Sequence, residues 1–175
     1  QYGITRIYHP DDGRSMGLQG MINDLLMKCD FPLGVSMNGE IAMIGNKEPK
    51  AIACLISVAE NHPEKASGIM QKVREKSLMK KTPVLGITGT GGAGKSSIID
   101  EIVRRFLADF NDKYIAVISV DPTKRKTGGA LLGDRIRMNS INSDRVYMRS
   151  LATRQSNLTR SKCMKDAVDI VKAAG

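Results

Sequence analysis

A glycine-rich motif in the middle of the chain limits the possible folds more than any other feature. Residues 89–96 read Gly-Thr-Gly-Gly-Ala-Gly-Lys-Ser, the G-x-x-x-x-G-K-S pattern of a phosphate-binding loop. An apolar run at 84–87 leads into the motif, and an amphipathic run at 98–110 follows it. We therefore expect a strand, the loop and a helix in that order. The alternative is a glycine-rich turn that matches by chance, but the flanking segments favour binding of a nucleoside triphosphate.

The residue types in the motif suit a triphosphate. Glycines allow backbone N–H groups to close around phosphate oxygens without a Cβ in the way. The Lys95 ammonium can lie against the β- and γ-phosphates, where it neutralises charge during hydrolysis and is the expected catalytic residue. The Ser96 hydroxyl can ligate Mg²⁺, and the following helix points the positive end of its dipole at the same anion. The expected nucleotide-binding residues of the motif are Gly91, Gly92, Ala93, Gly94, Lys95 and Ser96.

The segments after the motif predict an α/β fold with a P-loop NTPase core and an incomplete parallel sheet. The run at 98–110 places its apolar residues on one helical face, and the β-branched run at 114–120 is typical of a buried parallel strand. Together with strand 84–87 they would form a right-handed βαβ unit. Asp121 follows at the carboxyl end of the second strand, where parallel sheets bind ligands, and can reach phosphate-bound Mg²⁺. The alternative is that Asp121 only begins an Asp-Pro turn.

The segments before the motif predict two further parts. We expect a strand at 3–8, a turn at 9–13 that contains His9, and a helix with an apolar face from Leu18 to Cys29. One strand and one helix cannot bury a core alone, so we expect the remainder of that domain upstream. A linker then leads to a helical hairpin, 47–59 and 63–78, with a break at 60–63 that contains His62. The predicted domain boundaries are 1–31, 32–82 and 83–175.

The segment at 123–160 is polar, rich in glycine early and in arginine throughout. A loop of this length inside a compact domain is usually functional, and beside a phosphate-binding loop it predicts a nucleotide-sensing switch. Ser161 is expected to cap a last helix, whose inner face would comprise Met164, Ala167, Val168, Val171 and Ala174. Because two strands do not complete a sheet, we expect the chain to be a piece of a longer polypeptide.

The composition disfavours some classes of function. The formal net charge is +9, and eleven basic residues stand against three acids between 124 and 166. That excess can serve nucleotide phosphates, an acidic partner or RNA, but few aromatic residues accompany it, which disfavours nucleic acid. No apolar run approaches the length of a membrane span, and Cys29, Cys54 and Cys163 lack metal-ligand spacing. We expect a cytoplasmic protein, without a membrane partner, whose three thiols lie in the core.

Several of these stretches resemble a known family. Residues 88–97, 119–123 and 127–138 are similar to the MeaB/ArgK-type GTPases, which are G-protein chaperones of cobalamin-dependent acyl-CoA mutases. In the predicted hairpin, Ala51 and residues 55–61 are similar to the helices that precede the G domain of that family. The resemblance implies a P-loop GTPase fold for the second half of the chain.

Two further stretches make the resemblance more specific. Residues 2–24 are similar to the end of the flavodoxin-like cobalamin-binding domain of fused isobutyryl-CoA mutases, and residues 146–155 to their G-domain loop. In those proteins a cobalamin domain, a G domain and a mutase barrel follow one another on one chain. The resemblance implies a fragment of an adenosylcobalamin-dependent enzyme that converts isobutyryl-CoA to n-butyryl-CoA by a radical rearrangement. Its GTPase would gate cofactor loading and protect the mutase, and the intact protein would be a homo-oligomer.

The resemblance also implies site residues. It implies GTP or GDP as the nucleotide, contacts from Ser96, Asp121 and Asp134 to Mg²⁺, and a contact from Arg137 to the nucleotide. For Asp134 the alternative is a solvated acid paired with nearby arginines. The cobalamin-ligating D-x-H-x-x-G motif is expected upstream and the guanine-reading motif beyond Gly175, so the cobalamin-binding residues are unknown. The alternative functions are a stand-alone MeaB-like chaperone of methylmalonyl-CoA mutase, a P-loop kinase and a nucleotide-triggered binding module.

Overall fold

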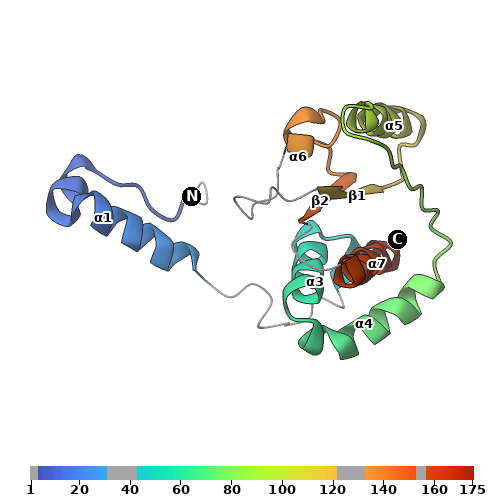
Figure 1. The fold of residues 1–175 in the computed structure, drawn as a ribbon, viewed down its shortest axis with the longest axis horizontal. Helices are drawn as coiled ribbons and strands as arrows, with labels where there is room; N and C mark the ends of the chain where they lie inside the picture. The colour runs from blue at the N-terminus through green and yellow to red at the C-terminus, as the bar shows by residue number, and fades with distance from the viewer. Residues whose placement is uncertain (1–3, 31–42, 122–132, 153–156) are drawn as a thin grey trace. The chain divides into compact units, whose positions relative to one another are not determined.

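The computed structural model describes residues 4–30, 43–121, 133–152 and 157–175 (Figure 1). The chain separates into two compact units, residues 1–35 and 36–175. Its helices and its pair of parallel strands confirm the predicted α/β class. Among the helices of the described ranges, none has the length and apolar character that crossing a membrane requires.

Helix α1 (Pro10–Cys29) is the main element of the first unit. His9 caps its N-terminus: the ring accepts a backbone N–H, and the His9 N–H donates to the Asp12 carboxylate (2.8 Å). Pro10 suits the first helical position because it has no N–H to satisfy. The turn predicted at 9–13 is therefore wrong, because this capped start belongs to the helix. The described residues 4–8 form no strand.

A kink at Gly17 divides α1 into two segments. Gly17 has φ +64°, which glycine adopts without the steric cost of a Cβ. The second segment confirms the helix predicted from Leu18 to Cys29, but its apolar side chains, Leu25 among them, are exposed within the described unit. Cys29 is exposed as well, so the prediction of a core thiol is wrong there, whereas Cys54 and Cys163 are half-buried.

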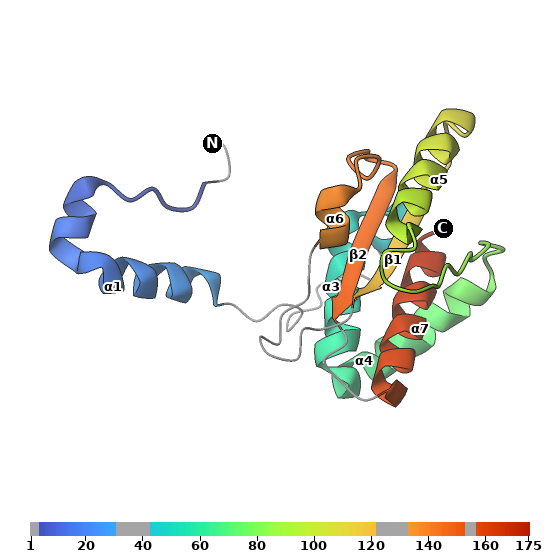
Figure 2. The same ribbon diagram turned by 45° about the horizontal axis from the view of Figure 1, so that its top comes forward.

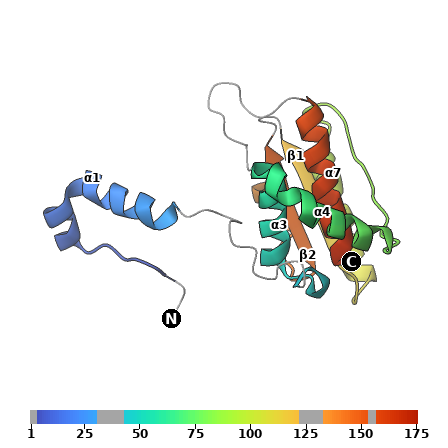
Figure 3. The same cartoon turned by 90° about the horizontal axis from the view of Figure 1, so that it is seen from below.

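The second unit has three layers, with a two-stranded sheet in the middle (Figures 1 and 2). Strands β1 (Ile115–Asp121) and β2 (Val146–Ala152) are parallel, and their register runs from Ile115 beside Val146 to Asp121 beside Ala152. Helices α5 (Lys95–Asp109) and α6 (Gly133–Arg137) lie on one side of the sheet. The other side is covered by α3 (Pro49–Asn61), α4 (Pro63–Leu78) and α7 (Asn157–Ala174) (Figure 3).

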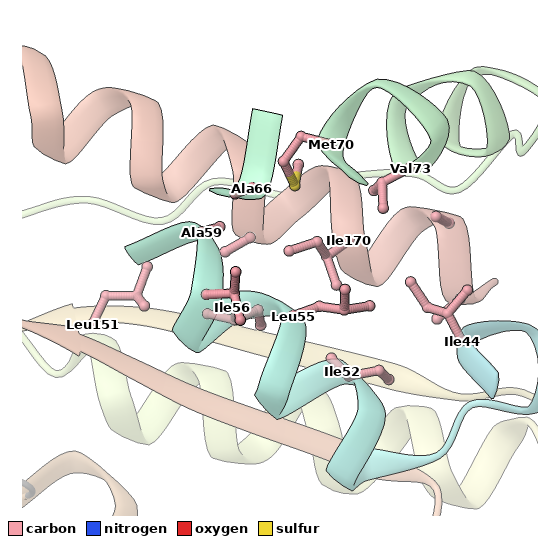
Figure 4. Packing of buried hydrophobic residues seen from close by; sticks show 14 residues of the cluster. Ile44, Ile52, Leu55, Ile56, Ala59, Ala66, Met70, Val73, Leu151 and Ile170 are labelled. Atoms are coloured by element: carbon pink, nitrogen blue, oxygen red, sulfur yellow. The ribbon is translucent and has the colours of Figure 1, made fainter. Parts of the chain in front are cut away.

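The helical side holds the larger core. Apolar side chains of α3, α4 and α7 meet there with Leu151 of β2 and with Ile44 of the 3₁₀ helix η1 (Ile44–Asn46) (Figure 4). The predicted hairpin is confirmed, with His62 between its helices. The last helix begins at Asn157 rather than at Ser161, because its polar first turn carries no apolar pattern. Ile170 is buried on this helix, whereas the predicted Met164 is exposed.

A smaller core lies on the opposite side of the sheet. It joins Val103 of α5, Val117 of β1, Met148 of β2 and Met138, which follows α6. Helix α5 and strand β1 therefore confirm the helix and the strand predicted after the glycine-rich motif. These elements put the N-terminus of α5, where the motif ends, in the same layered unit as the sheet.

In the second unit, two predictions about strands are wrong. Residues 84–87 form no strand, and Val84 and Leu85 are 62% and 72% exposed. A strand needs a neighbour to satisfy its N–H and C=O groups, and β1 instead pairs with β2, which lies in the segment predicted as a loop. The sequence concealed β2 because Arg149 and Ser150 interrupt the apolar residues on its two faces.

Candidate phosphate-binding site

The glycine-rich motif forms an exposed loop that ends at the N-terminus of α5. Gly94 immediately precedes the helix with φ +78°, and Gly92 has φ +79°, left-handed conformations that residues with side chains rarely adopt. A Cβ added at either glycine would meet no atom within 4 Å. The backbone conformation, not crowding, therefore requires glycine here, and the loop backbone stays open to a ligand.

Lys95 lies against this loop. Its Nζ donates hydrogen bonds to the carbonyl oxygens of Gly89 (2.9 Å) and Thr90 (2.7 Å). The first helical bond of α5 runs from the Ile98 N–H to the Gly94 oxygen (3.0 Å), so the positive end of the helix dipole meets the same loop. An ammonium, a helix N-terminus and glycine backbone thus converge on one place. This is an arrangement that binds phosphate.

The structure shows which elements contain the other predicted site residues, but it does not describe all of their side chains. Ser96 follows Lys95 as the second residue of α5. Asp121 ends β1 and Asp134 lies in α6, but the side chains of both lie outside the described part of the structure. Arg137 is the exposed last residue of α6. The contacts of Asp121 and Asp134 with Mg²⁺, and of Arg137 with nucleotide, therefore stay predictions.

Two contacts that the sequence did not indicate fasten α5 to the segment before β2. The Arg145 guanidinium donates to the carbonyl oxygens of Leu107 (3.0 Å) and Phe110, and so caps the C-terminus of the helix. Asp100 accepts the Ser140 N–H (2.8 Å), and this bond holds the pKa of Asp100 below its usual value. The partners are 35 to 40 residues apart in the chain, so no local pattern indicates them.

Comparison with known proteins relates this site to a family. The family described as "Methylmalonyl Co-A mutase-associated GTPase MeaB" matches residues 49–175. This match covers the glycine-rich loop, both strands and the helices from α3 to α7. Residues before 49 lie outside it.

Longer matches come from three curated relatives. The fused isobutyryl-CoA mutase of Geobacillus kaustophilus (strain HTA426) is 56% identical over 181 residues, covering 100% of this chain and 17% of the relative. The fused isobutyryl-CoA mutase of Cupriavidus metallidurans (strain CH34) is 48% identical over 177 residues, covering 99% of this chain and 16% of the relative. That of Nocardia farcinica (strain IFM 10152) is 47% identical over 154 residues, with coverages of 86% and 14%. The chain thus spans 14% to 17% of the length of these relatives.

Proposed function

The chain belongs to the MeaB family of methylmalonyl-CoA mutase-associated GTPases, and we propose that it is the part of a fused isobutyryl-CoA mutase that binds and hydrolyses GTP. The observation that carries the proposal is the convergence of the Lys95 ammonium, the α5 N-terminus and two left-handed glycines on one exposed loop. The geometry supports binding of a phosphorylated ligand. Membership of the GTPase family supports GTP as that ligand.

Similarity outside the GTPase match supports the fused arrangement. The family match begins at residue 49, yet the relatives from Geobacillus kaustophilus and Cupriavidus metallidurans align with 100% and 99% of the chain. The residues before 49 therefore resemble fused mutases too, which favours a fused protein over a stand-alone chaperone or a P-loop kinase. We propose that 1–31 end a cobalamin-binding domain, that 32–82 form a helical linker, and that 83–175 begin the GTPase domain.

In the proposed site, hydrolysis depends on positioning and on charge neutralisation. The Lys95 ammonium exchanges its loop carbonyl partners for phosphate oxygens, and the backbone N–H groups of 91–94 hold the same phosphates. Ser96, Asp121 and Asp134 offer hydroxyl and carboxylate oxygens, the donor type that Mg²⁺ prefers. Mg²⁺, when bound there, offsets phosphate charge. Arg137 contributes a further cation to the nucleotide.

In the intact protein, the proposed role of this GTPase is to gate loading of adenosylcobalamin and to protect the mutase. Adenosylcobalamin supplies the radical chemistry when bound, and other domains hold the acyl-CoA substrate. The proposed overall reaction interconverts isobutyryl-CoA and n-butyryl-CoA in a cytoplasmic homo-oligomer. The names of the three relatives support the choice of this acyl-CoA mutase.

The test of nucleotide binding is Lys95→Ala in the complete polypeptide. Removing the ammonium that pairs with the phosphates should cost about 2–5 kcal/mol of binding free energy, so the Kd for GTP should rise about 30-fold or more. Isothermal titration calorimetry with Mg²⁺ measures the Kd, and the cobalamin absorbance spectrum checks that cofactor binding persists. Lys81→Ala, at an exposed lysine before the loop, is the matched control and should bind GTP normally. Unchanged GTP affinity in Lys95→Ala would rule out the assignment of the loop.

A further inference from the structure

A polar contact joins the sheet to the helical hairpin. Tyr147, Arg149 and Leu151 share one face of β2 because side chains alternate along a strand. Leu151 packs beneath Ala59 of α3 in the core (Figure 4). Arg149, in the middle of this face, reaches α3 through Nη2, which donates to Ser57 Oγ (3.2 Å) and to Glu60 Oε2 (3.3 Å).

This contact uses only part of the hydrogen-bonding capacity of Arg149. One nitrogen, Nη2, serves both acceptors, while Nε is buried and has no partner among the described residues. Arginine and carboxylate commonly form two parallel bonds, and a buried donor without an acceptor is costly. A second arrangement, in which Nε and Nη2 both donate to the Glu60 carboxylate, would satisfy that donor. Such an arrangement would be a second position for the contact.

Space for the second position lies beside Glu60. A cavity of about 170 Å³ sits between the corner of the hairpin and α7. Its lining residues are Ala59, Glu60, Asn61, Pro63, Lys162, Cys163 and Asp166. This cavity is partly open to solvent, and Asn61 and Lys162 in its lining are exposed. The unfilled space lets the hairpin corner, and Glu60 with it, move relative to α7 without overlap.

Arg149 is also close to the edge of the sheet where nucleotide is proposed to bind. Ligands of parallel sheets lie at the carboxyl ends of the strands. Arg149 stands three residues before Ala152, which ends β2 beside Asp121 at the end of β1. At about 3.3 Å per residue, it lies about 10 Å from that edge. A change in the end of β2 would therefore reach Arg149 directly along one strand.

We propose that Arg149, Ser57 and Glu60 form a two-position joint through which nucleotide at the carboxyl edge of the sheet shifts the corner of the α3–α4 hairpin. The proposal rests on the proposed GTP binding and adds its route of communication. In the observed position, Arg149 shares one nitrogen between Ser57 and Glu60. In the other, it holds Glu60 with two nitrogens and the corner moves into the cavity. Each of the three residues positions the hairpin, and none contacts nucleotide.

The same helical layer contains a matched control. Arg74 of α4 donates to the buried carboxylate of Asp166 of α7 (2.7 Å), whereas Arg149 of β2 pairs with the half-buried Glu60 of α3. Both contacts link two elements of one layered unit. The Arg74 pair joins two helices, and although Asp166 also lines the cavity, the pair does not involve the sheet. Loss of the Arg74 pair should lower stability without affecting communication with the nucleotide edge.

The experiment compares nucleotide affinity with motion of the hairpin corner in the complete polypeptide. Calorimetry gives the ratio of the Kd for Mg-GDP to the Kd for the non-hydrolysable analogue Mg-GMPPNP. Hydrogen exchange is measured at the amides of residues 59–62 and 64–66 with each nucleotide bound. In the unmodified protein we expect exchange at the corner to differ between the two nucleotides. Arg149→Lys and Glu60→Gln should each change the Kd ratio by about 2- to 30-fold and reduce the exchange difference. The double variant should show no further change, because both substitutions break one joint.

Two comparisons make the result decisive. Arg74→Lys should lower the melting temperature and leave both the Kd ratio and the exchange difference unchanged. Ser57→Ala removes one acceptor without changing charge, and it tests the joint if the charge variants do not fold. If GMPPNP binds tightly, but every variant keeps the Kd ratio and the exchange difference of the unmodified protein, the joint is only structural and the inference is wrong. If GMPPNP does not bind the unmodified protein, the proposed function fails and the inference fails with it.

Discussion

Cys163 shows how the fold sets the chemistry of a single side chain. It lines the cavity at the hairpin corner. Burial, with smaller contributions from the Glu60 and Asp166 carboxylates, raises the pKa of its thiol to about 11. Since the thiolate is the reactive form, Cys163 should be almost inert at neutral pH. Nothing in its sequence neighbourhood distinguishes it from the exposed Cys29.

The pH dependence of Cys163 alkylation tests this environment. In the native protein, the rate with iodoacetamide should rise about tenfold per pH unit up to about pH 11, because the thiolate fraction rises in that way below the pKa. In urea the rise should end near pH 9.0, the ordinary value. The raised pKa also implies a stabilising contribution that is complete below about pH 9 and is lost as pH rises through about 11. Mass spectrometry of the Cys163 peptide measures the rates, and a native plateau near pH 9 would contradict the assignment.

At the scale of elements, α5 is attached to the unit by one face and by polar contacts with the segment before β2. Val103 is buried against the sheet, whereas Ile98 and Ile102 of the same helix are exposed within the described residues. The cap that Arg145 provides at the C-terminus adds to the packing of Ile99 and Leu107 against the same core. A cation suits this end because the helix dipole is negative there. The proposed phosphate site lies at the opposite end of the same helix, so the cap also supports the site.

Arg145→Ala should loosen the last turn of α5. Hydrogen bonds to a charged group contribute about 1.5–3 kcal/mol, so exchange of amides 106–109 should accelerate about 10- to 100-fold. Hydrogen exchange with mass spectrometry measures the effect. Arg105→Ala is the control, because the Arg105–Glu101 pair (2.7 Å) is exposed and such pairs contribute little. Equal acceleration in the two variants would show that Arg145 does not cap the helix.

At the scale of the molecule, residues before the glycine-rich loop and residues after it share one core. Side chains of α3 and α4 pack with α7 and with Leu151 of β2. The Arg74–Asp166 ion pair ties the hairpin to α7 in the same layer. The hairpin therefore packs as part of the second unit. Its integrity should affect nucleotide binding even though it contains no phosphate-binding residue.

Ile170→Ala tests this dependence. Ile170 is fully buried between the hairpin and the sheet, and truncation of such a residue costs about 2–5 kcal/mol. The urea concentration at which GTP binding is lost should fall accordingly, as measured by fluorescence of a labelled GTP analogue. Leu78→Ala, at the 84% exposed end of α4, is the control and should change stability by less than about 0.5 kcal/mol. A similar fall in both variants would argue against the shared core.

Predictions that rest on interactions within one segment were accurate, and predictions that depend on contacts between distant segments were not. The helices at 49–61, 63–78 and 95–109 were predictable because apolar residues recur at helical spacing within each segment. The strand at 84–87 was predicted from four local residues and does not form. The strand at 146–152 was missed because its pattern is mixed and its stability comes from pairing with β1. A strand is decided by its neighbour, which a local pattern does not specify.

The sequence by itself determined the phosphate-binding loop and its helix. Glycine supplies the left-handed backbone at positions 92 and 94, and Lys95 bonds to carbonyl oxygens only five and six residues away, so this geometry is local. Only the tertiary structure decided which strands pair, that Arg145 caps α5, and that Arg149 meets Glu60. Arg149 and Glu60 are 89 residues apart, and their contact exists because β2 and α3 pack face to face. Such contacts depend on the packing of whole elements, which no short stretch of sequence encodes.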